Sequence, residues 1–126
     1  SSSSGRLPVR CYRDLVVWQR SVDLVTGIYL TTRSFPNAER FGLTAQIRRA
    51  VVSIPSNIAE GQGRCTTGEF RQFLGHARGS LLEVETQICI AKNLGYLHEP
   101  CSGILFECVA EIGRILNGLI NSLKCR

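Results

Sequence analysis

The sequence predicts an all-α fold, an antiparallel up-down-up-down four-helix bundle. Apolar residues recur at steps of three and four along four long segments, and no segment shows the period of two that marks a β-strand. The connections between these segments are short, which favours antiparallel neighbours. The 126 residues are enough for one domain with its own core. We expect residues 1–11 to form a disordered or tag-derived tail and residues 12–126 to form the single domain.

The first predicted helix runs from Asp14 to Thr32. Asp14 suits the N-cap, because a carboxylate can accept hydrogen bonds from the first turn. Phe35-Pro36 ends the segment, since a residue before proline avoids helical geometry. The apolar seam expected to face the core consists of Leu15, Trp18, Val22, Val25 and Tyr29.

The second predicted helix, Asn37–Gly61, carries a proline near its middle and two different stripes. Pro55 removes one backbone donor and should bend the helix. An apolar stripe suited to the core consists of Leu43, Ile47, Val51, Ile54 and Ile58. A second stripe of mostly short hydrogen-bonding groups consists of Gln46, Arg49, Ser53, Asn57 and Glu60.

The third predicted helix begins at the capping-box sequence Thr66–Glu69 and reaches Leu94. Gly75 and Gly79, one turn apart, would permit close helix approach. The expected core seam consists of Phe70, Phe73, Ala77, Leu81, Val84, Ile88 and Ala91. A polar stripe accompanies it, formed by Glu69, His76, Ser80, Glu83 and Gln87. We expect the two polar stripes to meet in a buried, hydrogen-bonded seam that fixes the register of these helices.

The fourth predicted helix, Pro100–Lys124, has an apolar band wider than one bundle core needs. Its expected inner residues are Leu105, Cys108, Ile112, Ile115, Leu119 and Ile120, with Ile104, Leu116 and Leu123 alongside. A wide apolar band on one helix and second stripes on two others indicate further burial by self-association.

The net charge of +5 is concentrated in the first two thirds of the chain. Residues 1–80 contain eleven arginines against five acidic residues, a net +6, whereas residues 81–126 carry a net −1. Arginine prefers carboxylate and phosphate partners. One interpretation is therefore ion pairing within and between subunits, with Arg49 pairing to Glu60, Glu69 or Glu83. The other is a surface for a polyanion such as nucleic acid.

The sequence contains little that suggests catalysis, and we expect no enzymatic activity, no metal and no cofactor. Neither His76 nor His98 follows a glutamate by three residues, as a di-metal carboxylate bundle requires. Ser80 and His76 lie one turn apart, and their place on the polar stripe favours a structural role. The six cysteines include no C-x-x-C pair, and reduced thiols that pack as small apolar groups fit best: Cys11, Cys65, Cys89, Cys101, Cys108 and Cys125. No signal segment or membrane-spanning run is visible, so a cytoplasmic location is expected.

Long motifs in this chain resemble those of the four-helix-bundle proteins encoded by 23S rRNA intervening sequences. The first is Tyr12-x-x-Leu15-x-x-Trp18-Gln19, and the second is Phe35-Pro36-x-x-Glu39-x-x-Gly42-Leu43. The third runs from Gln46 through Arg48-Arg49-Ala50, Ser53-Ile54 and Asn57-Ile58-Ala59-Glu60-Gly61. The match continues from Glu69-Phe70 to Thr86. Glu111–Leu116 also resembles, more distantly, the accessory variability proteins of diversity-generating retroelements.

The resemblance implies a homopentamer without known enzymatic activity, and RNA or DNA and a reverse transcriptase as partners of some relatives. Our first hypothesis is therefore a non-catalytic, homo-oligomeric protein associated with nucleic acid, either rRNA or a retroelement ribonucleoprotein. The second is an assembly scaffold or adaptor that binds no nucleic acid. A hydrolase or metal enzyme is a third and weaker hypothesis. The candidate nucleic-acid contacts are Arg13, Arg20, Arg48, Arg64, Arg71 and Arg78.

Overall fold

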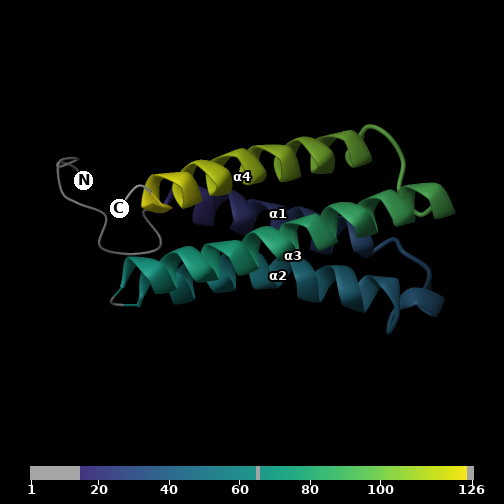
Figure 1. The fold of residues 1–126 in the computed structure, drawn as a ribbon. Helices are drawn as coiled ribbons and strands as arrows, with labels where there is room; N and C mark the ends of the chain where they lie inside the picture. The colour runs from purple at the N-terminus through teal and green to yellow at the C-terminus, as the bar shows by residue number, and fades with distance from the viewer. Residues whose placement is uncertain (1–14, 65, 125–126) are drawn as a thin grey trace, which may run out of the picture.

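The protein is a bundle of four antiparallel helices, as predicted (Figure 1). The computed structural model describes residues 15–64 and 66–124. Its helices are α1 (Val16–Thr32), α2 (Leu43–Gln62), α3 (Thr67–Leu94) and α4 (Cys101–Lys124), with a short 3-10 helix, η2 (Asn37–Glu39), before α2. The described residues include no strand. The predicted tail and the N-cap residue Asp14 lie outside the described residues.

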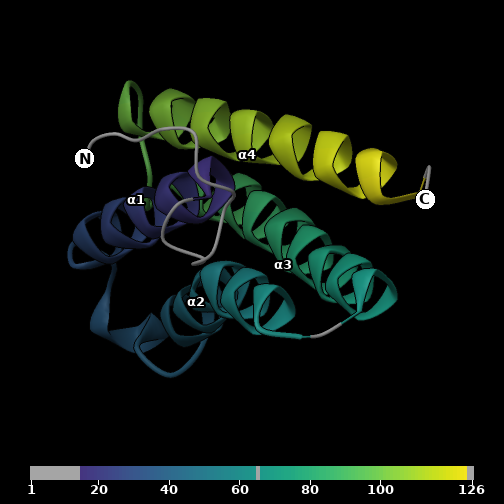
Figure 2. The same cartoon turned by 90° about the vertical axis from the view of Figure 1, so that its left-hand side faces the viewer.

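Each helix packs against its neighbours in sequence, and α1 packs against α4 to close the bundle. Figure 2 shows α4 above α1 and α3, on the side of the bundle away from α2. Arg20 on α1 and Glu111 on α4 form an ion pair of 3.5 Å across the closing contact. The up-down-up-down connectivity follows from these neighbour contacts together with the short turns.

The buried apolar core draws on all four helices, and on α2 and α3 it uses the apolar stripes predicted for them. Ile47, Val51, Ile54 and Ile58 are buried on α2. Along α3 the buried set includes Leu74 and five members of the predicted seam: Ala77, Leu81, Val84, Ile88 and Ala91. Burying such aliphatic side chains contributes about 1.5–3 kcal/mol each relative to leaving them exposed.

Helix α1 faces the core with a different stripe from the one predicted. Its buried residues are Val17, Ser21, Leu24, Ile28 and Thr32, whereas the predicted seam lies one position around the helix, half-buried up to Val25 and exposed at Tyr29. Ser21 and Thr32 are polar, but their hydroxyls donate to the carbonyls of Val17 (2.7 Å) and Ile28 (2.8 Å). Because these bonds satisfy the hydroxyls within the helix, burial costs little.

At Gly61, α2 lies close against α3. A β-carbon built on this glycine would lie 2.8 Å from Cβ of Phe73 and 2.9 Å from Cδ1 of Phe70, and the residue is buried. By contrast, Gly75 and Gly79 face open space, so the predicted close approach at these two glycines is wrong. The absence of a side chain at Gly61 therefore leaves room for Phe70 and Phe73 of α3.

Hydrogen bonds at three helix ends explain the element boundaries. The Thr66 hydroxyl accepts from the Glu69 amide (3.1 Å), which is one of the two hydrogen bonds of the predicted capping box. At the start of α2, the Glu39 carboxylate accepts from the Leu43 amide (3.1 Å). Gly95 ends α3 in the left-handed conformation, with φ of 85°, which glycine adopts without strain.

The turn after α3 is anchored to the segment before α2. The Tyr96 hydroxyl donates to the other Glu39 carboxylate oxygen (3.0 Å), and its ring packs against Phe35. The hydrogen bond to Glu39 raises the pKa of Tyr96. Glu39 therefore uses both oxygens, one as a helix cap and one as a link between distant parts of the chain.

Candidate nucleic-acid interface

The two predicted polar stripes lie beside each other along α2 and α3, but they form an open groove instead of a buried seam. Gln46, Arg49 and Ser53 line this groove with Glu83 of α3. Most of the ten residues are exposed or half-buried, and only Gln87 is buried. In sequence order the ten are Gln46, Arg49, Ser53, Asn57, Glu60, Glu69, His76, Ser80, Glu83 and Gln87.

The polar groups of the groove find partners within their own helix. Ser53 donates to the Arg49 carbonyl (3.0 Å), and Asn57 donates to the Ser53 carbonyl (2.7 Å). Glu60 pairs with Arg64 at 2.9 Å. Among the described residues no ion pair involves Arg49. The register of α2 and α3 is therefore set by the apolar contacts beneath the groove, and not by hydrogen bonds across it.

Three of the six arginines predicted to contact nucleic acid are engaged within the chain. Arg20 pairs with Glu111, and Arg64 pairs with Glu60 and stacks over the Phe73 ring at 5.2 Å. Arg48 donates through Nε to the Thr32 hydroxyl (2.8 Å), and its guanidinium lies 4.7 Å from the Tyr29 ring centroid. Arg48 has no carboxylate partner in the described chain, so its charge remains uncompensated.

Arg71 and Arg78 are predicted contacts that are exposed and also without an ion pair in the described residues. They lie seven residues apart on α3 and thus on one side of the helix. No ion pair of either residue is present within the described ranges. Arg13, the sixth predicted contact, lies outside the described residues.

The sequence-based list omitted Arg33 and Arg40, which the fold brings close to Arg48. All three line a small hollow between the end of α1, η2 and the start of α2. Their separation along the chain concealed this clustering. The three arginines come together because of the path that the chain takes through the turn before α2. Helical periodicity in the sequence does not predict the path of a turn.

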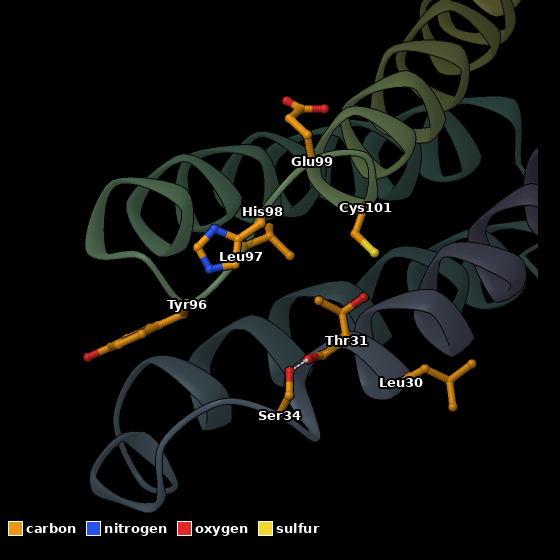
Figure 3. A pocket seen from close by; sticks show the side chains of 8 residues that line it. All are labelled: Leu30, Thr31, Ser34, Tyr96, Leu97, His98, Glu99 and Cys101. Atoms are coloured by element: carbon orange, nitrogen blue, oxygen red, sulfur yellow. Dashed lines mark hydrogen bonds between the residues drawn. The ribbon is translucent and has the colours of Figure 1, made fainter.

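A larger hollow of about 390 Å³ lies between the end of α1 and the turn that leads into α4 (Figure 3). His98, Glu99 and Cys101 line it, yet Figure 3 shows the Glu99 carboxylate directed away from the other two side chains. No hydrogen bond joins these three residues in the structure described. Glu99 instead accepts from Lys92 (3.1 Å), and this bond lowers the pKa of the Glu99 carboxyl.

The other residues considered for chemistry are also dispersed. His76 is exposed and packs edge-on against Phe73, and it forms no hydrogen bond with Ser80 in the described part of the chain. Cys89 and Cys101 are exposed free thiols, so the prediction that the thiols pack as small apolar groups fails for them; it holds for half-buried Cys108. Cys11, Cys65 and Cys125 lie outside the described residues. Residues 15–64 and 66–124 hold no group of three potential metal ligands.

Apolar side chains gather on the outer side of α1 next to α2. Val25, Tyr29 and Leu30 of α1 and Val52 of α2 line a hollow of about 320 Å³. Tyr29 is 40% exposed and Leu30 is 59% exposed. Tyr29 and Leu30 face outward because α1 turns its Ser21–Thr32 side to the core, whereas Val25 is half-buried and also packs against the core. No described helix combines the length and hydrophobicity needed to span a membrane.

Comparisons with known proteins agree with this fold. The family model for the 23S rRNA-intervening sequence protein matches residues 13–118. A crystal structure of a protein of unknown function from the S23 ribosomal protein family of Bacteroides thetaiotaomicron is similar, with a TM-score of 0.77 and 22% identity. That match covers 84% of this chain and 96% of the other. No curated protein matches the sequence. Because the family model spans most of the residues, this chain belongs to the 23S rRNA-intervening sequence protein family.

Proposed function

We propose that this protein is a non-catalytic homo-oligomer that associates with nucleic acid through its arginines. The observation that supports this most directly is the lack of carboxylate partners. Of the arginines in the described residues, only Arg20 and Arg64 form ion pairs. The arginines without such a pair are Arg33, Arg40, Arg48, Arg49, Arg71, Arg78 and Arg114.

Uncompensated arginines are better suited to a polyanion than to stabilising the single chain. Even an exposed ion pair contributes at most about 1 kcal/mol to stability, and most of these arginines form none. Stability of the single chain therefore does not explain their number. Phosphates of nucleic acid accept bidentate hydrogen bonds from guanidinium and release counterions on binding. Five copies of a chain of charge +5 would carry +25, which strengthens attraction to RNA or DNA.

Self-association is supported by apolar surface that the single bundle does not bury. Besides the hollow lined by Val25, Tyr29, Leu30 and Val52, exposed large apolar residues include Val16, Phe41, Leu82, Leu94 and Ile104. Apolar side chains gathered at one place on the surface, as at this hollow, are typical of protein interfaces. Burial of the α2–α3 groove in such an assembly would also give Arg49 and Glu83 new partners. The number of subunits, five, rests on the family resemblance.

A scaffold or adaptor that binds no nucleic acid is the second candidate. The same apolar surface favours it, with the free arginines pairing to carboxylates of a protein partner. The resemblance to accessory variability proteins implies a reverse transcriptase as one such partner. Recovery of a stable protein partner without bound nucleic acid would support this alternative.

The test combines assembly size with salt-dependent binding. Light scattering coupled to size exclusion should give a multiple of the 13.9 kDa chain. Fluorescence anisotropy with single-stranded RNA and duplex DNA should show affinity that falls with salt, with a log–log slope of about −0.7 to −0.9 per phosphate contacted. Absence of RNA and DNA binding at low salt would refute the proposal.

Matched arginine variants separate surface contacts from general charge. Arg71→Gln with Arg78→Gln should weaken binding and reduce the salt slope by about 2, because two phosphate contacts are lost. Arg20→Gln with Arg64→Gln removes the same charge from arginines that are already paired, and it should change the slope less. Equal effects of the two double variants would show that only net charge matters.

A further inference from the structure

Arg33, Arg40 and Arg48 line a hollow of about 160 Å³ whose other walls are Thr32, Thr44 and the Phe35–Asn37 turn. None of its lining residues is acidic. Glu39, which is close in sequence, uses its two oxygens for the Leu43 amide and the Tyr96 hydroxyl. Three arginines therefore line one small space, and the Arg40 guanidinium also lies 5.6 Å from the exposed Phe41 ring, with no carboxylate in the lining to balance their charge.

Arg48 is held in place by the fold before any ligand arrives. Its Nε donates to the Thr32 hydroxyl at 2.8 Å, and its guanidinium stacks over the Tyr29 ring at 4.7 Å. Thr32 is buried and donates in turn to the Ile28 carbonyl. These contacts use Nε and one face of the guanidinium and leave its two terminal nitrogens available. A fixed donor pair loses little side-chain entropy on binding, which favours affinity.

Thr44 provides a second, independent indication of a ligand. This residue lines the hollow, is 7% exposed, and its hydroxyl has no hydrogen-bond partner. A buried hydroxyl without a partner costs about 1–3 kcal/mol. Ser21 and Thr32, also buried, each donate to a carbonyl four residues earlier, whereas the Thr44 hydroxyl makes no such bond. Thr44 also lies in the first turn of α2, where backbone N–H groups favour anions.

We propose that this hollow is a binding site for a single dianionic phosphate group, held by Arg33, Arg40 and Arg48 with the Thr44 hydroxyl. Three positive charges and a hydroxyl donor match the charge and the several acceptor oxygens of a phosphate. A hollow of about 160 Å³ that is open to solvent accommodates a phosphate group. Free phosphate and the terminal phosphate of a nucleic acid share this chemistry. The site does not depend on the nucleic-acid proposal.

Calorimetric titration of inorganic phosphate into the full chain, at ionic strength held constant with chloride, tests the site. One saturable site per chain is expected, together with a melting temperature that rises with phosphate and not with chloride. Arg40→Gln should weaken binding about tenfold, since one charge-assisted contact is lost. Arg20→Gln, an equal charge change at an arginine that already pairs with Glu111, should leave phosphate affinity unchanged. Non-saturable binding, or equal losses in the two variants, would overturn the proposal.

Thr44→Val gives a readout that a misfolded variant cannot imitate. Removing an unpartnered buried hydroxyl should raise the melting temperature of the phosphate-free chain while phosphate affinity falls several-fold. Unchanged phosphate affinity in this variant would remove Thr44 from the site, and with it the reason to place the ligand there.

Competition with oligonucleotides distinguishes the source of the phosphate. If a 5′-phosphorylated RNA displaces inorganic phosphate better than the same RNA with a 5′-hydroxyl, the ligand is a nucleic-acid end. If neither displaces it, the ligand is a free or small-molecule phosphate. A chain that binds phosphate but no RNA or DNA at low salt would refute the proposed function and leave this site intact.

Discussion

Helix α1 carries two stripes, and the more polar of the two is the one that faces the core. The inner stripe, with Ser21 and Thr32 among its members, is buried, whereas the outer stripe contains Trp18, Val25 and Tyr29 and stays partly exposed. Hydroxyls that bond to their own helix can be buried at little cost. The partly exposed apolar stripe is therefore compatible with a stable fold, and it offers a surface that a further partner can cover.

Truncation of a leucine on each side of α1 should separate the two surfaces most strongly. Leu24→Ala removes a side chain that is 1% exposed and should lower the free energy of unfolding by about 3 kcal/mol. Leu30→Ala, with 59% of the residue exposed, should cost less than about 1 kcal/mol. Chemical denaturation of dilute protein measures both. A Leu30→Ala cost that grows with protein concentration would show that an assembly buries the hollow lined by Val25, Tyr29 and Leu30.

The same contrast applies to glycines on α2 and α3. Gly61→Ala places a methyl group 2.8 Å from Cβ of Phe73, and the required shift should cost about 1–3 kcal/mol. Gly75→Ala meets open space on an exposed helix side and should stabilise by up to about 1 kcal/mol. Thermal unfolding of the two variants should give melting temperatures on opposite sides of the wild type. A destabilising Gly75→Ala would indicate that a second subunit packs there.

Sequence periodicity identified the buried side of a helix when only one side was apolar. On α2 and α3 the polar stripes are clear, and most of the predicted core residues are buried, whereas Leu43, Phe70 and Phe73 are half-buried. On α1 two neighbouring stripes share the same three- and four-residue spacing, and apolar content alone selected the outer one. The stripe that contains Ser21 and Thr32 can be buried because both hydroxyls donate to carbonyls of their own helix. The apolar content of a stripe does not report these hydrogen bonds.

The candidate sites were less predictable than the helices. The arginines on α3 could be assigned to one side because helical spacing orders them. Arg33, Arg40 and Arg48 meet only through the turn and η2 that connect α1 to α2. The polar stripes of α2 and α3 were located correctly, but their exposure was not, because short polar groups that bond within their own helix do not need a facing partner.

A buried hydroxyl on the inner stripe should be almost dispensable. Ser21 is fully buried, and its hydroxyl donates to the Val17 carbonyl at 2.7 Å. Ser21→Ala removes the hydroxyl and its acceptor contact together and gains helix propensity, so the free energy of unfolding should change by less than about 0.5 kcal/mol. Denaturant titration measures this change. A loss above about 2 kcal/mol would show that the hydroxyl has a role beyond its own helix.

The smallest expected effect is a difference in alkylation rate between two thiols of α4. Cys108 is half-buried against the core, and burial, followed by the nearby Glu111 carboxylate, raises the pKa of its thiol. Cys101 is exposed on the same helix. Since the thiolate is the reactive form, Cys108 should be alkylated several-fold more slowly than Cys101 at mildly alkaline pH. Peptide mapping after timed iodoacetamide treatment compares the two. Equal alkylation rates of Cys101 and Cys108 in the folded chain would contradict the placement of Cys108 at the core. If Cys108 is alkylated slowly in the folded chain and as fast as Cys101 in denaturant, packing is the cause of its protection.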